Sequence, residues 1–127
     1  MELKGNLVFL GMMGSGKSSI GLLVAKKLNS DFIDIDNVIE KELGKSISTI
    51  FKIKGETYFR KIEEKITLKK LKLKNVIISL GGGAFINKSI RKEVLKNHIT
   101  FWLNWNERTL FNRIKKDPLL LTLIKTN

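Results

Sequence analysis

The sequence of 127 residues contains no cysteine, which excludes a disulfide framework and a cysteine-based zinc site. It has a single proline, and none of its apolar runs approaches the ~20 residues that a membrane-spanning helix needs. The N-terminal segment carries an acidic residue early and reaches a glycine after a short apolar run, so it does not resemble a signal peptide. These absences favour a cytoplasmic protein without a membrane partner.

Acidic residues are scarce: the sequence has 12 aspartates and glutamates against 24 lysines and arginines, which gives a net charge of +12. Such an excess attracts anions, and nucleic acid is one class of partner to consider. Almost all of the basic residues are lysines dispersed along the chain, and only Arg60, Arg91, Arg108 and Arg113 offer planar guanidinium groups. The dispersed lysines therefore argue against nucleic acid as a partner.

Short apolar runs alternate with stretches of helical periodicity. The pattern predicts strands over residues 6–10, 31–36, 75–80 and 99–103. It predicts helices over residues 17–28, 37–43, 46–54, 56–71, 87–97 and 106–116, and the second of these should begin at Asn37 and end near Gly44. Strands that alternate with helices need crossover connections, so we expect a single α/β domain over residues 1–127, with a parallel sheet of about four strands and flanking helices. The one histidine, His98, precedes a strand and is expected to be structural.

The stretch GMMGSGKS at residues 11–18 follows a predicted strand and opens a predicted helix. It matches the phosphate-binding pattern G-x-x-x-x-G-K-[ST]. Glycines let successive backbone N–H groups point at phosphate oxygens, Lys17 can reach the β- and γ-phosphates, and the Ser18 hydroxyl can bind Mg²⁺. The alternative is a glycine turn that contains a lysine by chance. The predicted nucleotide-binding residues here are Gly11, Gly14, Ser15, Gly16, Lys17, Ser18 and Ser19.

Two aspartates, Asp34 and Asp36, end the second predicted strand. Residues two apart share one side of an extended chain, so both carboxylates can face one ligand. Asp34 can approach Mg²⁺ through water, and Asp36 can accept a proton from a substrate hydroxyl. The alternative is that these acids are turn residues or helix caps, which are common at strand ends.

Arg60 lies on a predicted helix with Glu56, Glu63 and Glu64 one turn away on either side. These four residues are either a surface ion-pair ladder of small energetic value or an arginine held by acids and directed at an anionic substrate. The glycine triplet at residues 81–83 follows the third predicted strand. It is either a turn or a segment whose backbone a small ligand can approach closely.

Taken together, GMMGSGKS, DIDNVIE, GETYFRKIEE and SLGGGAF make the chain from Asn6 to Leu103 resemble shikimate kinase, a small kinase of the nucleoside monophosphate kinase-like class. The resemblance implies a P-loop NTPase fold and a monomer. It also implies phosphorylation of the 3-hydroxyl of shikimate, with ATP as co-substrate and Mg²⁺ as cofactor, in aromatic amino-acid (chorismate) biosynthesis.

The resemblance also assigns roles to residues. It makes Lys17 and Asp36 catalytic, and it makes Ser18 and Asp34 the metal-associated pair. It gives shikimate-binding roles to Asp36, Arg60, Gly81, Gly82 and Gly83, and it places Arg113 beside the adenine. Phe51 and Phe59 match apolar walls of the shikimate pocket, although each can equally belong to the core.

One departure from the family pattern concerns its mobile lid, which carries an arginine directly before Pro-Leu-Leu. Here Asp117 precedes Pro118, and a carboxylate there would repel phosphate. We find no counterpart of the rest of the lid or of the family's last strand and helix, so we expect an incomplete lid and a sheet edge through which the chain can self-associate. Two alternatives stay open: a nucleotide-binding chain with impaired catalysis, and another small-molecule kinase such as a gluconate kinase.

Overall fold

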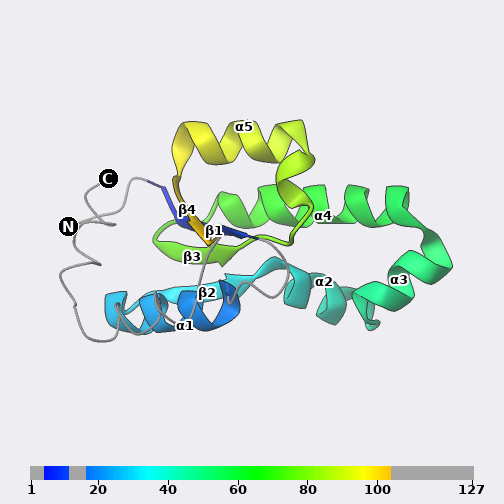
Figure 1. Ribbon diagram of the computed structural model, residues 1–127, viewed down its shortest axis with the longest axis horizontal. Helices are drawn as coiled ribbons and strands as arrows, with labels where there is room; N and C mark the ends of the chain where they lie inside the picture. The colour runs from blue at the N-terminus through cyan, green and yellow to red at the C-terminus, as the bar shows by residue number, and fades with distance from the viewer. Residues whose placement is uncertain (1–4, 12–16, 104–127) are drawn as a thin grey trace.

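The computed structural model describes residues 5–11 and 17–103 (Figure 1). Its strands are β1 (Leu7–Gly11), β2 (Asp31–Asp34), β3 (Val76–Ser79) and β4 (Ile99–Leu103). All of the pairings between them are parallel, and the strand order is β2-β3-β1-β4. The predicted parallel sheet is therefore confirmed, and β2, which follows β1 in the chain, is separated from it by β3.

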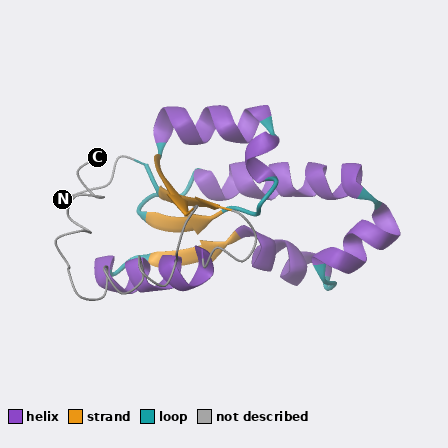
Figure 2. Ribbon diagram, in the orientation of Figure 1, coloured by secondary structure: helices purple, strands orange, loops and turns teal. Residues whose placement is uncertain are grey.

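The described helices alternate with the strands, as the sequence predicts (Figure 2). They are α1 (Lys17–Leu28), α2 (Ile35–Leu43), α3 (Ile47–Lys54), α4 (Glu56–Leu71), a 3₁₀ turn η1 (Ala84–Ile86) and α5 (Lys88–Asn97). The bounds of α1 and α4 are those predicted from the sequence. The helix predicted over residues 106–116 lies outside the described residues.

The other described bounds differ from the predicted ones by at most one residue, but the junction between the second strand and the next helix is wrong by two residues. The second strand ends at Asp34 rather than at residue 36, and α2 begins at Ile35 rather than at Asn37. The reason is local: the Asp34 side chain accepts hydrogen bonds from the backbone N–H groups of Asp36 and Asn37, which makes Asp34 the N-cap of the helix. Asp36 therefore lies in the first helical turn, and the expectation that both carboxylates share one side of an extended strand is also wrong.

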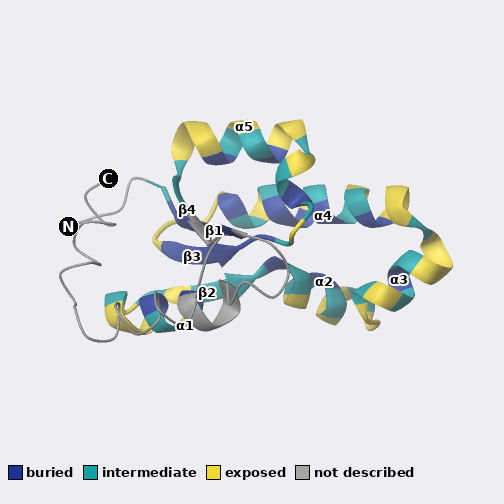
Figure 3. Cartoon of the chain, viewed as in Figure 1, coloured by how far each residue is buried: buried dark blue, intermediate teal, exposed yellow. Residues whose placement is uncertain are grey.

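The sheet has an apolar layer on each face, and the alternation of side chains along β1 divides its residues between them. Leu7 and Phe9 pack with Val24 of α1, whereas Val8 and Leu10 join a larger cluster that contains residues of α2, α4 and α5. Figure 1 shows α1 on one side of the sheet and α4 with α5 on the other. Figure 3 shows the central strands β1 and β3 buried between these helices, whereas the edge strands β2 and β4 are largely of intermediate burial.

The helices α2 and α3 extend away from the sheet, and α4 returns to it (Figure 1). The chain turns between α2 and α3 at Gly44, whose φ of 65° is a conformation that glycine adopts readily. Ser46 caps the N-terminus of α3 by accepting a hydrogen bond from Thr49 N–H. Among the described residues, no helix is long and apolar enough to cross a membrane.

The register of the strands brings three chain segments to the same edge of the sheet. Asp34, at the end of β2, pairs with Ser79 of β3, and Ser79 pairs with Phe9 of β1. Parallel strands have their carboxyl ends at one edge, so the phosphate-binding sequence, Asp36 and the glycine triplet all leave the sheet there. This edge is where a ligand site is expected in an α/β fold.

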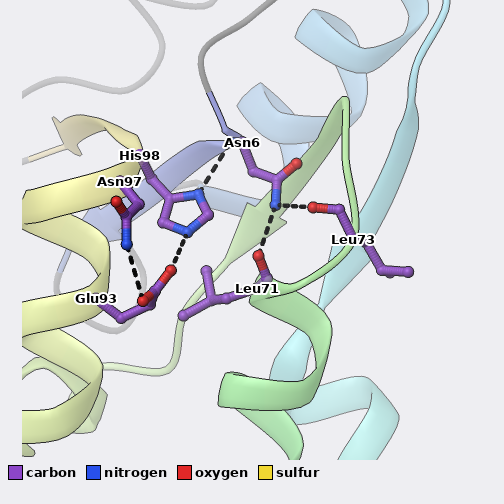
Figure 4. A network of polar contacts seen from close by, with 6 residues as sticks. All are labelled: Asn6, Leu71, Leu73, Glu93, Asn97 and His98. Carbon is purple, nitrogen blue, oxygen red and sulfur yellow. Dashed lines mark hydrogen bonds and ion pairs between the residues drawn. The ribbon is translucent and has the colours of Figure 1, made fainter.

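The opposite end of β1 is held by a buried asparagine (Figure 4). Asn6 accepts a hydrogen bond from Val76 N–H through its side-chain oxygen, and its amide group donates to the carbonyl oxygens of Leu71 and Leu73. Its backbone N–H donates to Nδ1 of His98, which leaves Nε2 of that ring as the donor to Glu93, 3.0 Å away. These contacts fit the structural role expected for His98.

We expect Asn6→Ala to lower the free energy of unfolding by about 2–4 kcal/mol, because it leaves a buried N–H and two carbonyl groups without their partner. Urea denaturation of the two proteins measures the difference. Asn97→Ala is the control, since it removes the bond from an exposed asparagine to Glu93 and should change stability by less than about 0.5 kcal/mol. Equal losses in both variants would contradict a special role for Asn6.

Candidate active site

The phosphate-binding sequence lies between a buried strand and a helix, which is the context that its function requires. β1 ends at Gly11, and Lys17, Ser18 and Ser19 open α1. The predicted residues Gly14, Ser15 and Gly16 fall outside the described residues, as do Arg113 and Asp117. The N-terminus of α1 thus lies at the carboxyl edge of the sheet, where its partial positive charge favours phosphate.

The glycine triplet at residues 81–83 brings Asp36 and Arg60 close to one short segment of backbone. A Cβ atom placed on Gly81 would lie 2.6 Å from Oδ1 of Asp36, and one placed on Gly83 would lie 2.5 Å from Nη2 of Arg60. Both positions must therefore be glycine for these two side chains to remain where they are. The structure thus places two of the predicted substrate-binding side chains against the predicted triplet.

Arg60 is held by a carboxylate and by two aromatic rings. Its Nη1 atom donates to Oε1 of Glu63 at 2.9 Å, and its Nη2 atom lies 3.6 Å from Oε2 of Glu56. The guanidinium carbon is 5.9 Å from the ring centre of Phe51 and 5.3 Å from that of Phe59. These contacts fix a planar cation, and 36% of the Arg60 side chain remains exposed to receive an anion.

Phe51 and Phe59 have the core role that was one of the two considered for them. Their ring centres are 4.7 Å apart, Phe59 is buried within the core, and Phe51 packs against that core. The same two rings also face the Arg60 guanidinium. Arg60 is therefore supported by two rings of the core, and their role as walls of a shikimate pocket stays a prediction.

Glu63 is the partner of Arg60 that the sequence did not distinguish from its neighbours. The Glu63 side chain is 2% exposed, whereas the Glu56 side chain is 69% exposed. Only the pair of Arg60 with Glu56 is therefore a surface ion pair of the kind expected in a ladder. Burial raises the pKa of Glu63 above its ordinary value, although the hydrogen bond and the charge of Arg60 oppose that rise. Glu63 differs from Glu56 and Glu64 because it lies on the buried face of α4.

Glu63 should make stability depend on pH in a defined direction. Because its pKa is higher in the folded state than in the unfolded state, its favourable contribution is complete below the unfolded pKa of about 4.3 and is lost as the pH rises through the folded pKa. Glu63→Gln does not titrate and should gain stability relative to the native chain over that window, by at most about 1.4 kcal/mol per pH unit. Parallel stability curves from urea denaturation at pH 4–8 would contradict this.

A cavity of about 420 Å³ opens beside Arg60. It lies between the first half of α4 and the segment that follows the glycine triplet. Its lining carries both signs of charge: it consists of Glu56, Thr57, Arg60, Lys61, Glu64, Gly83, Ile86 and Asn87. Arg60 and Gly83 therefore border this space, whereas Asp36 lies at the other end of the triplet, beside Gly81.

The residues proposed for Mg²⁺ offer the oxygen ligands that this ion prefers. Asp34 ends β2 at the carboxyl edge of the sheet, and Ser18 is the second residue of α1 at the same edge. Within the described residues, no group of three or more histidine, cysteine, aspartate or glutamate side chains gathers as a metal cage. Mg²⁺ is usually held by one or two protein ligands together with waters and substrate phosphates, and one carboxylate with one hydroxyl is a ligand set of that kind.

Comparison with known proteins decides between the kinase families. The profile of the family described as "Shikimate kinase" matches residues 13–125. A shikimate kinase of Persephonella marina is 43% identical over 118 residues, which cover 91% of this chain and 72% of that protein. The chain belongs to the shikimate kinase family. This membership favours shikimate kinase over the gluconate kinase considered from the sequence.

Two further relatives agree with this family. A shikimate kinase of Geobacillus kaustophilus is 42% identical over 123 residues, which cover 91% of this chain and 64% of that protein. The structure of the Acinetobacter baumannii shikimate kinase, solved in complex with shikimate, has a TM-score of 0.79 and 30% identity, and the match covers 94% of this chain and 68% of that one. The P-loop kinase fold expected for the family is thus confirmed, and the chain spans about two thirds of the length of these relatives.

Proposed function

We propose that this chain transfers the γ-phosphoryl group of ATP to the 3-hydroxyl of shikimate. The proposal rests on the glycine triplet, which has a carboxylate beside Gly81 and a guanidinium beside Gly83. Gly81 and Gly83 are two residues apart within a single turn, which the hydrogen bond from Ala84 N–H to the carbonyl oxygen of Gly81 closes, so both side chains lie against one short stretch of backbone. A small ring that carries a carboxylate at one end and hydroxyl groups at the other matches this pair of side chains.

Each side chain then has a defined task. Arg60 binds the substrate carboxylate, because its guanidinium can present two parallel N–H groups to two oxygens. Asp36 accepts hydrogen bonds from the hydroxyl groups and takes the proton of the 3-hydroxyl as that oxygen attacks phosphorus. Lys17 binds the transferring phosphate and compensates the charge that develops on it.

Magnesium and the cellular setting complete the proposal. Ser18 and Asp34 would hold Mg²⁺, which would supply positive charge that offsets part of the negative charge of the nucleotide phosphates. We propose that the chain acts in the cytoplasm as a monomer whose partners are ATP and shikimate. Two alternatives to this proposal stay as predictions. One is self-association through a sheet edge, and the other is nucleotide binding without turnover.

Ligand-dependent thermal stability tests the choice of substrate. Shikimate should raise the melting temperature more than gluconate or a nucleoside monophosphate does, because a ligand stabilises the state that binds it. Arg60→Lys should weaken the affinity for shikimate about tenfold or more, since an ammonium group cannot bind a carboxylate in the same bidentate way. Arg91→Lys, a matched change on α5 where Arg91 donates to the carbonyl of Phe85, should leave the shikimate effect in place.

Two results would count against the proposal. Protection by gluconate and not by shikimate would show that the substrate is wrong. Protection by shikimate and ATP without release of ADP in a coupled assay would show that the chain binds both ligands and does not transfer the phosphoryl group.

A further inference from the structure

The junction between β2 and α2 is built around Asp34. This residue ends the strand with extended dihedral angles, φ −98° and ψ 113°. Its Oδ1 atom accepts a hydrogen bond from Asp36 N–H at 3.1 Å and from Asn37 N–H at 3.5 Å. One of the two donors thus belongs to Asp36 itself.

Asp36 is consequently restrained at both its backbone and its side chain. The bond to Asp34 fixes its N–H group in the first turn of α2, where helix ends otherwise fray. Its carboxylate rests against the backbone of Gly81, in space that a Cβ atom would occupy. Loss of the cap would release the first turn of α2 and with it the position of the carboxylate.

We propose that Asp34 is a positioning residue for phosphoryl transfer, because its carboxylate caps α2 and thereby holds Asp36 against Gly81. This inference rests on the proposed function, in which Asp36 contacts the hydroxyl groups of shikimate. The role differs from association with Mg²⁺. Capping needs an acceptor oxygen at a set distance from the backbone, whereas a metal ion needs the negative charge.

Two substitutions separate these requirements. Asp34→Asn keeps an acceptor oxygen at the same position and removes the charge, and asparagine is as good an N-cap as aspartate. Asp34→Glu keeps the charge and moves the oxygens outward by one methylene group, which breaks the cap geometry. Ser46→Ala is the matched control, because it removes the equivalent cap from the neighbouring helix α3.

The first measurement is hydrogen exchange of the Asp36 and Asn37 amides in the ligand-free protein. The second is the affinity for shikimate by calorimetry, without nucleotide or Mg²⁺. Asp34→Asn should keep the amide protection and bind shikimate within about twofold of the native chain. Asp34→Glu should lower both the amide protection and the shikimate affinity about fivefold, which corresponds to the usual contribution of an N-cap. Ser46→Ala should speed exchange at Thr49 and leave the affinity within about twofold.

Several outcomes would overturn the inference. A loss of affinity in Asp34→Asn together with native affinity in Asp34→Glu would show that charge matters and capping does not. Native affinity in Asp34→Glu with unprotected amides would separate the cap from substrate binding. If Asp34→Glu does not fold, Asp34→Thr replaces it as a weaker cap, and its affinity must then fall below that of Asp34→Asn. A native chain that binds no shikimate would instead overturn the proposed function, and the positioning role with it.

Discussion

Replacing Lys17 by alanine should lower kcat/KM for ATP-dependent phosphorylation of shikimate by at least about 10²-fold. Lys17 opens α1 directly after the phosphate-binding loop, so its ammonium group is the cation that the sequence pattern assigns to the transferring phosphate. Removing one preorganised donor to developing charge commonly costs 10²–10³-fold in rate. The measurement is ADP release in a coupled assay with purified protein.

The same helix provides the control for this prediction. Lys26 is exposed in the last turn of α1, at the end remote from the phosphate-binding loop. Lys26→Ala removes the same charge from the same helix and should leave kcat/KM within about twofold. A Lys17→Ala protein that retains native turnover and nucleotide affinity would show that the loop does not bind the transferring phosphate.

Gly81→Ala should also lower kcat/KM about 10²-fold while leaving the fold in place. The added methyl group would lie 2.6 Å from Oδ1 of Asp36, so the carboxylate must move away from the triplet. The atom that moves is the end of a side chain, which keeps the cost in stability small. A misplacement of about 1 Å in a reacting group can reduce the rate 10²-fold.

Gly44→Ala is expected to show the opposite pattern. No heavy atom lies within 4 Å of a Cβ placed there, but the φ of 65° is unfavourable for alanine. This variant should lose about 1 kcal/mol of stability without losing activity. The melting temperature and kcat/KM of Gly81→Ala and Gly44→Ala, measured side by side, distinguish a loss of activity from a loss of stability. Native activity in Gly81→Ala would contradict the catalytic role proposed for Asp36 at its position beside Gly81.

The sequence is sufficient to predict the parts of the site that depend on local pattern. GMMGSGKS indicates phosphate binding because the glycines, lysine and serine act within a single loop and helix. Asp36, Arg60 and the glycine triplet are also predicted as substrate residues, through the resemblance of their segments to one family. Their mutual contacts are not predictable in this way, because they join segments that are distant in the chain.

Asp34 and Glu63 show where local pattern is ambiguous. An aspartate at the end of a strand fits a metal site and a helix cap equally well in sequence, and only the hydrogen bonds to Asp36 and Asn37 show that it caps α2. Glu56, Glu63 and Glu64 are all close to Arg60 along one helix. Which of them is buried depends on the packing of α4 against the core, and the 2% exposure of Glu63 decides it.

Local patterns in the sequence are enough to predict the four described strands, the bounds of α1 and α4, and the phosphate-binding motif, because hydrophobic periodicity and glycine content act over a few neighbouring residues. The strand order β2-β3-β1-β4, the buried contacts of Asn6, and the placement of Asp36 and Arg60 beside the glycine triplet are known only from the folded chain. These features join residues far apart in the chain, so they follow from side-chain packing and strand register, which no local pattern specifies.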